Sequence, residues 1–381
     1  MTDDAAAVHE RVFTIDTHCD TATGPLARAG WDFGLRHEAA EDGSQVDLPR
    51  MRAGGVDAMV WAVYVTQAAR TARGFARAHA LAVRTCERVR AVVAAKANEC
   101  VVVTTADEAC AAKAAGKRAI FLSLENSYSL GREIAHVAKF RALGVRMIGL
   151  THMLNNEVAD ASTDPRGEEW GGLSPLGREL VAECNRRGIV LDASHASDET
   201  LRQMLALSRS PVVLSHSGCR AVCDHPRNIG DALLRELAAA GGVIQINALP
   251  VAVVPDPRGE ERTRAFAALL LSLAEKELTP DVEAWAEGEW HRLGRTWPNP
   301  VATLADFVRH VEHAVEIAGI DHVGIGCDFD GGGGVRGLND VSDFPRLTAA
   351  LLQRGWKEAE VAKVWGRNTL RVLGAAAAQA E

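Results

Sequence analysis

Eight short apolar runs alternate with longer helical segments along the chain, and this alternation constrains the fold more than any other feature of the sequence. The runs are rich in Val, Ile and Leu and are nearly continuous, which is typical of strands buried on both faces of a parallel sheet. The predicted strands are Val12–His18, Asp57–Val65, Arg118–Glu125, Val145–His152, Ile189–His195, Val212–His216, Val243–Asn247 and His322–Asp328.

The segments between these runs are amphipathic and rich in Ala, Arg and Glu, which indicates helices, and several of them end at glycine. Examples of predicted helices are Ala72–Asn98, Ala106–Ala115, Ile134–Leu143, Leu176–Arg187, Ser197–Leu207 and Asp231–Ala240. Eight strands in strict alternation with helices predict an α/β fold of the (β/α)8 TIM barrel type, and a chain of 381 residues fits one such domain spanning residues 1–381. A doubly wound open sheet is the alternative, but no G-x-G-x-x-G follows the first strand.

Two long connections interrupt the alternation. Val158–Ser174 is rich in Gly, Asp and Trp and is predicted to form a loop at the surface or the mouth of the barrel. The connection between strands seven and eight contains prolines around helical segments that carry Trp285, Trp290 and Trp297. We expect residues 248–300 to form an insertion that walls the active-site mouth, and the tryptophans there are compatible with a homodimer.

Composition excludes several classes of protein. Lys and Arg number 42 against 50 Asp and Glu, and no basic cluster is present, so nucleic acid and anionic membranes are not expected partners. The 47% of hydrophobic residues argue against global disorder, and no apolar stretch reaches the length of a membrane span. The eight cysteines never form C-x-x-C and are predicted to be reduced thiols, mostly buried. We therefore expect a soluble cytoplasmic protein.

Polar residues gather where the predicted strands end. Active sites of (β/α)8 barrels are built at the carboxyl ends of the strands, so side chains at these positions are expected to meet at one mouth. Four histidines and three carboxylates occupy such positions: His18, His152, His195, His216, Asp20, Glu125 and Asp328.

The chemistry of these residues indicates a metal site. His18 and Asp20 form an H-x-D pair whose side chains point to the same side of a strand, and imidazole with carboxylate suits Zn²⁺ and its neighbours. His195 and His216 end adjacent strands and could chelate a second ion, with Glu125 between the two. Two such ions share a water molecule and hold it as hydroxide near neutral pH. Asp16 either supports this site or caps the local backbone.

Ordered motifs along nearly the whole chain resemble one family, the membrane (renal-type) dipeptidases, including their soluble bacterial members. The motifs are IDTHCDT, SLEN, LTHMLNN, GLSPLGRELVAECNRRGIVLDASHAS, SHSGCRAVCDHPRNIGD, HVGIGCDFDG and GRNTLRVL. The resemblance implies a dinuclear metallo-hydrolase of the amidohydrolase type that hydrolyses free dipeptides, L-Xaa-L-Xaa and L-Xaa-D-Xaa, through a metal-bridging hydroxide.

The resemblance also implies roles for the polar residues. One Zn²⁺ would be bound by His18 and Asp20, the other by His195 and His216, and both by Glu125, with Co²⁺ or Mn²⁺ as substitutes. The implied substrate contacts are His152 to the scissile carbonyl oxygen, Arg227 to the C-terminal carboxylate, and Asp328 to the α-amino group and, as proton donor, to the leaving amine. Asp330 would shape the loop, and Tyr128 would either line the pocket or pack in the core.

One segment departs from the family pattern, and two alternative functions remain open. The segment Gln245–Val254 contains Asn247 and no tyrosine, so an aromatic substrate contact from this segment is not carried over. A related amidohydrolase acting on lactones, cyclic amides or N-acyl amino acids is the first alternative. It is disfavoured by H-x-D in place of H-x-H at the first strand and by Arg227 with Asp328. A catalytically silent binding protein is the second, and the presence of all five candidate metal ligands disfavours it.

Overall fold

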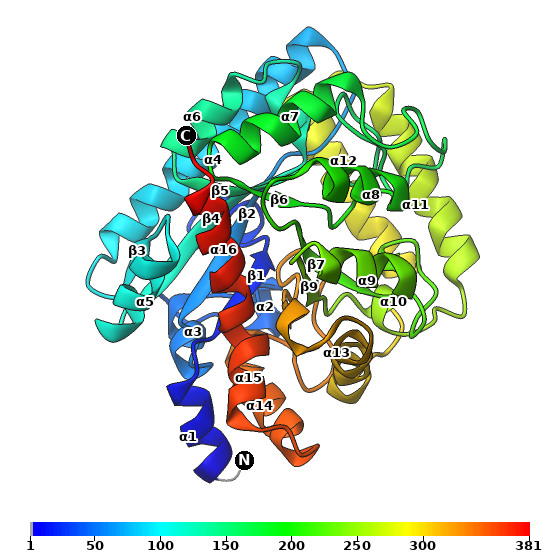
Figure 1. Cartoon of the computed structure of the whole chain (residues 1–381). Coiled ribbons are helices and arrows are strands. Elements are labelled where there is room, and N and C mark those ends of the chain that lie inside the picture. Colours follow the sequence, from blue (N-terminus) through cyan, green and yellow to red (C-terminus); the bar gives the residue numbers. More distant parts are fainter. Residues whose placement is uncertain (1–2) are drawn as a thin grey trace.

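A parallel barrel of eight strands forms the centre of the molecule, with helices around it (Figure 1). The computed structural model of the chain describes residues 3–381. Neighbouring strands follow one another around the barrel in the order β1 (Ile15–Cys19), β2 (Ala58–Tyr64), β4 (Arg118–Glu125), β5 (Val145–Gly149), β6 (Val190–Asp192), β7 (Val213–Cys219), β9 (Val243–Ile246) and β10 (Val323–Ile325).

The barrel closes between its first and last strands through backbone contacts just beyond the end of β10. Cys19 pairs with Phe329 in a parallel bridge. The amide of Asp20 donates to the carbonyl of Phe329 at 2.9 Å, and the amide of Asp328 donates to the carbonyl of His18 at 3.1 Å. This closure places the residues that follow β1 and β10 side by side.

The predicted (β/α)8 barrel is confirmed, and each of the eight predicted strands overlaps an observed one. The observed strands are mostly shorter than predicted, so His152 and His195 lie in the turns that follow β5 and β6. Two strands were not predicted, β3 (Cys100–Val102) beside β4 and β8 (Asn228–Ile229) beside β7. Both lie outside the closed ring of eight strands, each paired with one strand only.

The α-helices cover the outside of the barrel, and each predicted helix is present with small differences at its ends. The helices are α1 (Asp3–Arg11), α2 (Ala39–Asp42), α3 (Leu48–Ala53), α4 (Ala72–Ala95), α5 (Ala106–Ala114), α6 (His136–Ala142), α7 (Pro175–Arg186), α8 (Asp198–Leu207), α9 (Asp231–Ala239), α10 (Pro250–Val253), α11 (Gly259–Ala274), α12 (Pro280–Thr296), α13 (Leu304–Ala318), α14 (Phe344–Gln353), α15 (Glu358–Ala362) and α16 (Asn368–Ala378). Shorter helical segments are η1 (Pro25–Ala27), η2 (Ser127–Leu130), η3 (Ile320–His322), η4 (Val341–Asp343) and the π-helical η5 (Lys363–Arg367).

Alternation along the strands divides the core into two apolar clusters and decides which polar side chains enter the mouth. One cluster joins alternate residues of many strands with α16, and its strand members are Ile15, Ala58, Val60, Ala119, Phe121, Met147, Val190, Val213 and Val243. Residues from so many strands meet only inside the barrel, so these positions point inward. Because side chains alternate with a period of two, Glu125, Asp192 and Asn247 share the inward side with Phe121, Val190 and Val243.

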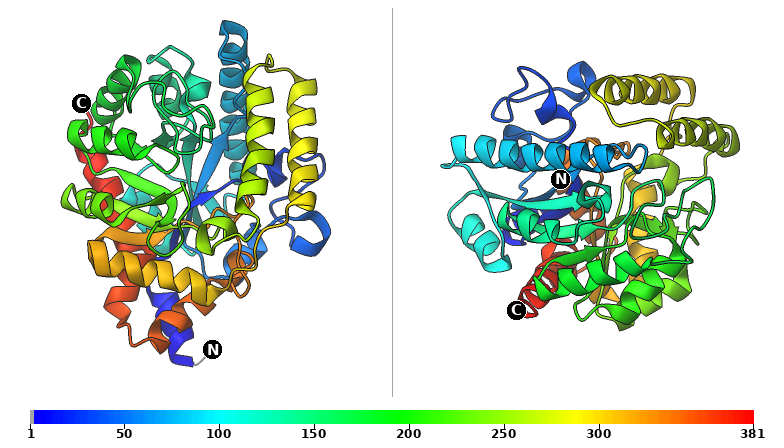
Figure 2. Two further views of the ribbon diagram at one scale, coloured as in Figure 1. Left: turned by 90° about the vertical axis from the view of Figure 1, so that its right-hand side faces the viewer. Right: turned by 90° about the horizontal axis from the view of Figure 1, so that it is seen from above.

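The two long connections differ in their structure. Residues 158–174 contain no regular helix or strand, as predicted, apart from isolated bridges. Residues 248–300 contain α10 and an antiparallel pair, α11 and α12, which lies beside α4 (Figure 2). The pair packs through its own small apolar cluster around Leu269, Leu273, Ala286 and Leu293. Within residues 3–381, no helix combines the length and the apolar character that crossing a lipid bilayer requires.

All eight cysteines are free thiols, and all but Cys110 are buried, in agreement with the prediction. Cys19 belongs to the second and larger of the two apolar clusters, together with residues such as Trp61 and Leu122. Burial raises the pKa of its thiol well above the usual value.

Candidate metal centre

Glu125 lies at the centre of a histidine and carboxylate cluster in the barrel mouth. Its side chain is 6% exposed, and its two oxygens face different residues. Oε2 lies 3.6 Å from Nε2 of His18. Oε1 lies 3.2 Å from Nε2 of His195, 3.7 Å from that of His216 and 3.8 Å from that of His152. The donors thus form two groups that meet at Glu125, and His18 is also close enough to His216 to share a group of donor atoms with it.

The first group lies where β1 and β10 close the barrel. Nε2 of His18 is 3.4 Å from an oxygen of Asp20 and 3.8 Å from one of Asp328. Gly331 makes this approach possible, because a Cβ there would lie 2.1 Å from Oδ2 of Asp20 and 2.3 Å from Oδ1 of Asp328. Asp328 itself has a φ of 62°, a conformation that Asp tolerates better than most residues. The motif GCDFDG thus directs the Asp328 carboxylate into the cluster.

The second group pairs His195 with His216, whose Nε2 atoms are 2.9 Å apart. Burial lowers the pKa of both imidazoles well below the usual value, and the charges of Arg227 and His18 act in the same direction. Neutral imidazole is the form that binds metal ions. Two neutral nitrogens aimed at one point suit a shared cation.

A hydrogen-bond chain sets the tautomer of His216. The hydroxyl of Ser215 donates to Oδ2 of Asp192 at 2.6 Å and lies 2.9 Å from Nδ1 of His216. Since Ser215 has given its only proton to Asp192, its oxygen accepts from the Nδ1–H of His216. Nε2 of His216 is thereby left with a free lone pair on the side of Glu125. Asp192 and Ser215 were not predicted, although each is a polar residue inside an apolar run just before a histidine.

The crowding of carboxylates shifts their pKa values. Burial raises the pKa of Glu125 to about 8 and that of Asp328 to about 7, with the charge of Asp20 acting in the same direction. Burial alone would lower the pKa of His18, but the neighbouring charges of Glu125, Asp20 and Asp328 outweigh it and raise this pKa to about 10. The cluster holds more negative charge than its own residues neutralise, which favours a bound cation.

Asp16 supports the cluster through the backbone. Its side chain is fully buried and accepts hydrogen bonds from the amides of His18 at 2.9 Å and Cys327 at 3.0 Å. These bonds tie β1 to the segment that carries Asp328. Asp330, in turn, accepts from the hydroxyl of Thr21 and the amide of Gln45, so it shapes the loop.

The donor set fits a bound metal ion. Three groups of three side chains each bring one donor atom per residue within 4.8 Å of one another: His18 with Glu125 and His216, Glu125 with His152 and His195, and His18 with Asp20 and Asp328. Nε2 of His18 is buried and has no hydrogen-bond partner among the described residues. Nitrogen and carboxylate donors of this kind suit Zn²⁺, Co²⁺ and Mn²⁺.

Arg227 and His152 lie beside the candidate metal ligands. The Arg227 side chain is buried, Nη2 donates to the carbonyl of His216 at 3.1 Å, and Nη1 has no partner within residues 3–381. Burial lowers the pKa of Arg227 to about 10, so its guanidinium stays charged. Burial and the charge of Arg227 lower the pKa of His152 to about 3, so His152 is a neutral hydrogen-bonding group.

Tyr128 is not brought to the cluster by the contacts that the structure shows. Its side chain is 1% exposed, its hydroxyl donates to the carbonyl of Ala69 at 3.0 Å, and its ring packs against Phe75. These contacts agree with the packing alternative. The tyrosine at the mouth is Tyr64, whose ring centroid lies 4.6 Å from that of His152. Its position one residue before the end of the second predicted strand is the signal that could have identified it.

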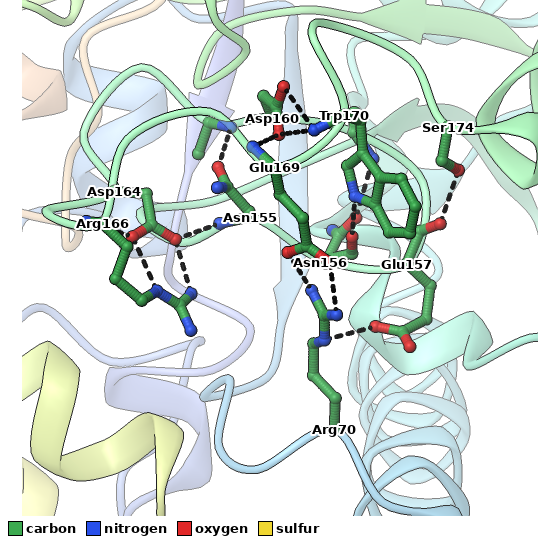
Figure 3. A network of polar contacts seen from close by, with 12 residues as sticks. Arg70, Asn155, Asn156, Glu157, Asp160, Asp164, Arg166, Glu169, Trp170 and Ser174 are labelled. Atoms are coloured by element: carbon green, nitrogen blue, oxygen red, sulfur yellow. Dashed lines mark hydrogen bonds and ion pairs between the residues drawn. The ribbon is translucent and has the colours of Figure 1, made fainter.

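The loop that follows His152 is held by a dense polar network (Figure 3). Asp160 accepts from the amides of Glu169, Trp170 and Gly172. The amide of Ser162 donates to the carbonyl of His195 at 2.8 Å, which ties the loop to a candidate metal ligand.

Comparison with known proteins agrees with this geometry. Residues 2–381 match the family model described as membrane dipeptidase (peptidase family M19). The chain is 31% identical over 357 residues to dipeptidase tcpJ of Claviceps purpurea, an alignment that covers 91% of this chain and 74% of that protein. The crystal structure of the probable dipeptidase PvdM from Pseudomonas aeruginosa superimposes with a TM-score of 0.85 at 30% identity, covering 99% of this chain and 98% of the other. A metallo peptidase from Rhodobacter sphaeroides, solved with a phosphinate mimic of L-Ala-D-Ala, shares the fold with a TM-score of 0.76 at 23% identity, covering 96% and 99%.

Proposed function

The chain belongs to the membrane dipeptidase family, peptidase family M19, and on this premise we propose that it hydrolyses the peptide bond of free dipeptides with two Zn²⁺ ions held around Glu125. The observation that carries this proposal is the division of the Glu125 carboxylate, with Oε2 toward His18 and Oε1 toward His195 and His216. A single carboxylate between two sets of donors is what a dinuclear hydrolase needs.

We assign His18 and Asp20 to one ion and His195 and His216 to the other. Co²⁺ and Mn²⁺ are expected substitutes, because such ligand sets discriminate poorly among these ions. When bound, the ions supply Lewis-acid chemistry, which lowers the pKa of a water molecule toward neutrality and polarises the scissile carbonyl.

The remaining residues recognise the two charged ends of a dipeptide. Arg227 pairs with the C-terminal carboxylate, because its buried guanidinium has an uncommitted nitrogen and a planar fork that matches a carboxylate. Asp328 pairs with the α-amino group. With one fixed cation and one fixed anion, the site selects substrates of two residues.

Proton transfer is assigned to Asp328. Burial raises the pKa of this carboxyl to about 7, which suits a group that takes up a proton and then releases it to the leaving amine near neutral pH. Neutral His152 donates a hydrogen bond to the scissile carbonyl oxygen as negative charge develops there. Tyr64 packs against the ring of His152 and holds its orientation.

We further propose that the insertion at residues 248–300 walls the mouth. The amide of Ala69 donates to the carbonyl of Lys276 at 2.8 Å, and the hydroxyl of Thr71 donates to Glu277 at 2.7 Å. The turn between α11 and α12 therefore lies against the connection that follows Tyr64.

The test is a panel of L-L and L-D dipeptides offered to protein of measured metal content. We expect turnover of free dipeptides, loss of turnover with a chelator and recovery with Zn²⁺. L-Ala-D-Ala belongs in the panel because its phosphinate mimic binds the Rhodobacter sphaeroides relative. N-acetylated and C-terminally amidated dipeptides should be poor substrates, since each lacks one end charge. Full turnover by metal-free protein would contradict the proposal, and preference for a lactone or an N-acyl amino acid would favour the alternative chemistry.

A further inference from the structure

Asn247 lies in the barrel mouth between the elements that carry Arg227 and Asp328. It follows β9 directly and shares the inward side of that strand with Val243. The backbone amide of Asn247 donates to the carbonyl of Ser217 at 2.8 Å, on the strand that leads to Arg227. The backbone amide of the next residue, Ala248, donates to the carbonyl of Cys327 at 3.3 Å. Asn247 is thus flanked on both sides by segments that carry substrate-binding residues.

The carboxamide of Asn247 is buried without a partner. The residue is 1% exposed, and neither Nδ2 nor Oδ1 has a hydrogen-bond partner among residues 3–381. Other buried asparagines at this mouth are bonded: Nδ2 of Asn156 donates to the carbonyl of Leu150, and Nδ2 of Asn126 donates to Gln67. Buried polar groups are rarely left unpaired, so this amide is available for a bound molecule.

We infer that Asn247 is a specificity-determining residue that selects dipeptides with a hydroxyl or carboxamide side chain. This inference rests on the proposed function, in which Arg227, Asp328 and His152 take the carboxylate, the amine and the scissile carbonyl. The groups of a dipeptide that remain are the peptide N–H and the two side chains. A peptide N–H satisfies only Oδ1 of Asn247, whereas a hydroxyl or carboxamide both donates and accepts and so satisfies Oδ1 and Nδ2 together.

Isosteric dipeptide pairs test the selection. Thr is compared with Val and Asn with Leu, each placed in turn at the first and second position with Ala at the other. For the metal-loaded protein we expect kcat/KM to favour the polar member at one position by about tenfold or more, because an apolar side chain leaves the buried amide unpaired. Asn247→Leu, which has similar volume and no polar atoms, should abolish or reverse this ratio. Its melting temperature should not fall below that of the wild type, since no protein hydrogen bond is lost.

Two further variants separate selection from structural damage. Asn247→Asp keeps the shape of the side chain and its acceptor oxygen but loses the Nδ2 donor. A substrate hydroxyl can still donate to the carboxylate, so the preference for Thr over Val should survive. The oxygen of a substrate carboxamide loses its donor, so the preference for Asn over Leu should weaken. Asn185→Leu is the matched control, because Asn185 is equally buried in α7 but its amide donates to the carbonyl of Val181 and its oxygen accepts from Ser210. This control should lose melting temperature and keep the polar-to-apolar ratio.

The outcomes distinguish this inference from the proposed function. If the metal-loaded wild type cleaves no dipeptide, the proposed function fails. If it cleaves both members of every pair equally, or if Asn247→Leu leaves the ratio unchanged, the inference is overturned and the dipeptidase activity stands. An equal loss of kcat/KM on all substrates would indicate that the side-chain amide of Asn247 binds the main chain of the substrate, and this outcome would also overturn the inference. If Asn247→Leu does not fold, the ratios of Asn247→Asp decide.

Discussion

Two polar assemblies lie close together at the mouth of this barrel, and they are built on opposite principles. In the loop that contains Asp160 and Asp164, each of these carboxylates accepts several hydrogen bonds from its own loop (Figure 3). In the cluster around Glu125, carboxylates face one another, and buried atoms such as Nε2 of His18 and Nη1 of Arg227 lack hydrogen-bond partners within the described residues. The carboxylates of the loop find their hydrogen-bond donors within the loop, whereas the cluster leaves buried polar atoms for a bound ligand.

The pKa values express the same difference. Burial acts to raise the pKa of Asp164, but hydrogen bonds from Arg166 outweigh it and the pKa falls below the usual value. For Glu125 the charge of His18 does not outweigh burial, and the pKa rises to about 8. Changes in the cluster should therefore affect chemistry more than folding, and changes in the loop should do the reverse.

Glu125→Gln is expected to have the largest effect. Loss of the shared carboxylate should lower kcat/KM by on the order of 10³-fold or more and reduce the bound metal. The metal-free variant should unfold at the same or a higher temperature than metal-free wild type, because the pKa of about 8 leaves Glu125 largely uncharged near neutral pH and a neutral amide takes its place without a buried charge. Kinetics, metal analysis and thermal unfolding measure these effects. A variant that keeps both metals and full activity would contradict the assigned role.

Asp328→Asn should lower kcat by about 10²- to 10³-fold while bound Zn²⁺ is retained, because the amide cannot carry the proton to the leaving amine. Metal analysis alongside steady-state kinetics distinguishes the loss of a proton donor from the loss of a metal ligand. Wild-type kcat in a folded, metal-loaded variant would exclude Asp328 as the proton donor.

The affinity for Zn²⁺ should rise with pH by about tenfold or more per unit between about pH 6 and about pH 8. The raised pKa values mean that Glu125, at about 8, and His18, at about 10, are protonated in this range without metal, and both lose a proton when they bind one. Calorimetry in buffers of different ionisation enthalpy counts the protons released. An affinity independent of pH would show that these residues do not bind the metal.

Asp160→Ala tests the loop. Three backbone amides lose their acceptor, so the free energy of unfolding should fall by about 2 to 3 kcal/mol. The activity of the folded fraction should change little, because Asp160 contacts none of the proposed ligands in the structure. Chemical denaturation and kinetics on the same preparation measure the stability and the activity. If the loss of kcat/KM, expressed as a free energy, exceeded the loss in the free energy of unfolding, the contrast between loop and cluster would be wrong.

Ser215→Ala should have the smallest effect, a loss of about tenfold in Zn²⁺ affinity, because His216 loses the group that holds its tautomer. Competition with a chelator of known affinity measures it. Ser208→Ala, in the turn after α8, is a control of the same chemistry away from the mouth. Equal affinities for Ser215→Ala and wild type would show that the tautomer is set without this hydroxyl.

Prediction from the sequence worked where structure and chemistry are encoded in adjacent residues. An apolar run that ends in His or Glu specifies both a buried strand and a polar residue at its carboxyl end, so His195 and Glu125 could be placed before the fold was known. Tyr64 lies one residue before the end of a predicted strand, and no role in the site was predicted for it. The two tyrosines have similar local sequence signals, and only packing separates a ring beside His152 from one beside Phe75.

The sequence by itself determined the order of the strands, the barrel they form and the kinds of donor atoms that reach its mouth, because hydrophobic periodicity and residue type act over a few neighbouring positions. Only the tertiary structure decided which of those atoms are satisfied. Whether Ser215 orients His216, whether Gly331 leaves room for Asp20, and whether Asn247 has a partner all depend on distances between segments that are far apart in the chain. Hydrogen bonds and ionic contacts are made or lost within fractions of an ångström, and no local pattern carries that information.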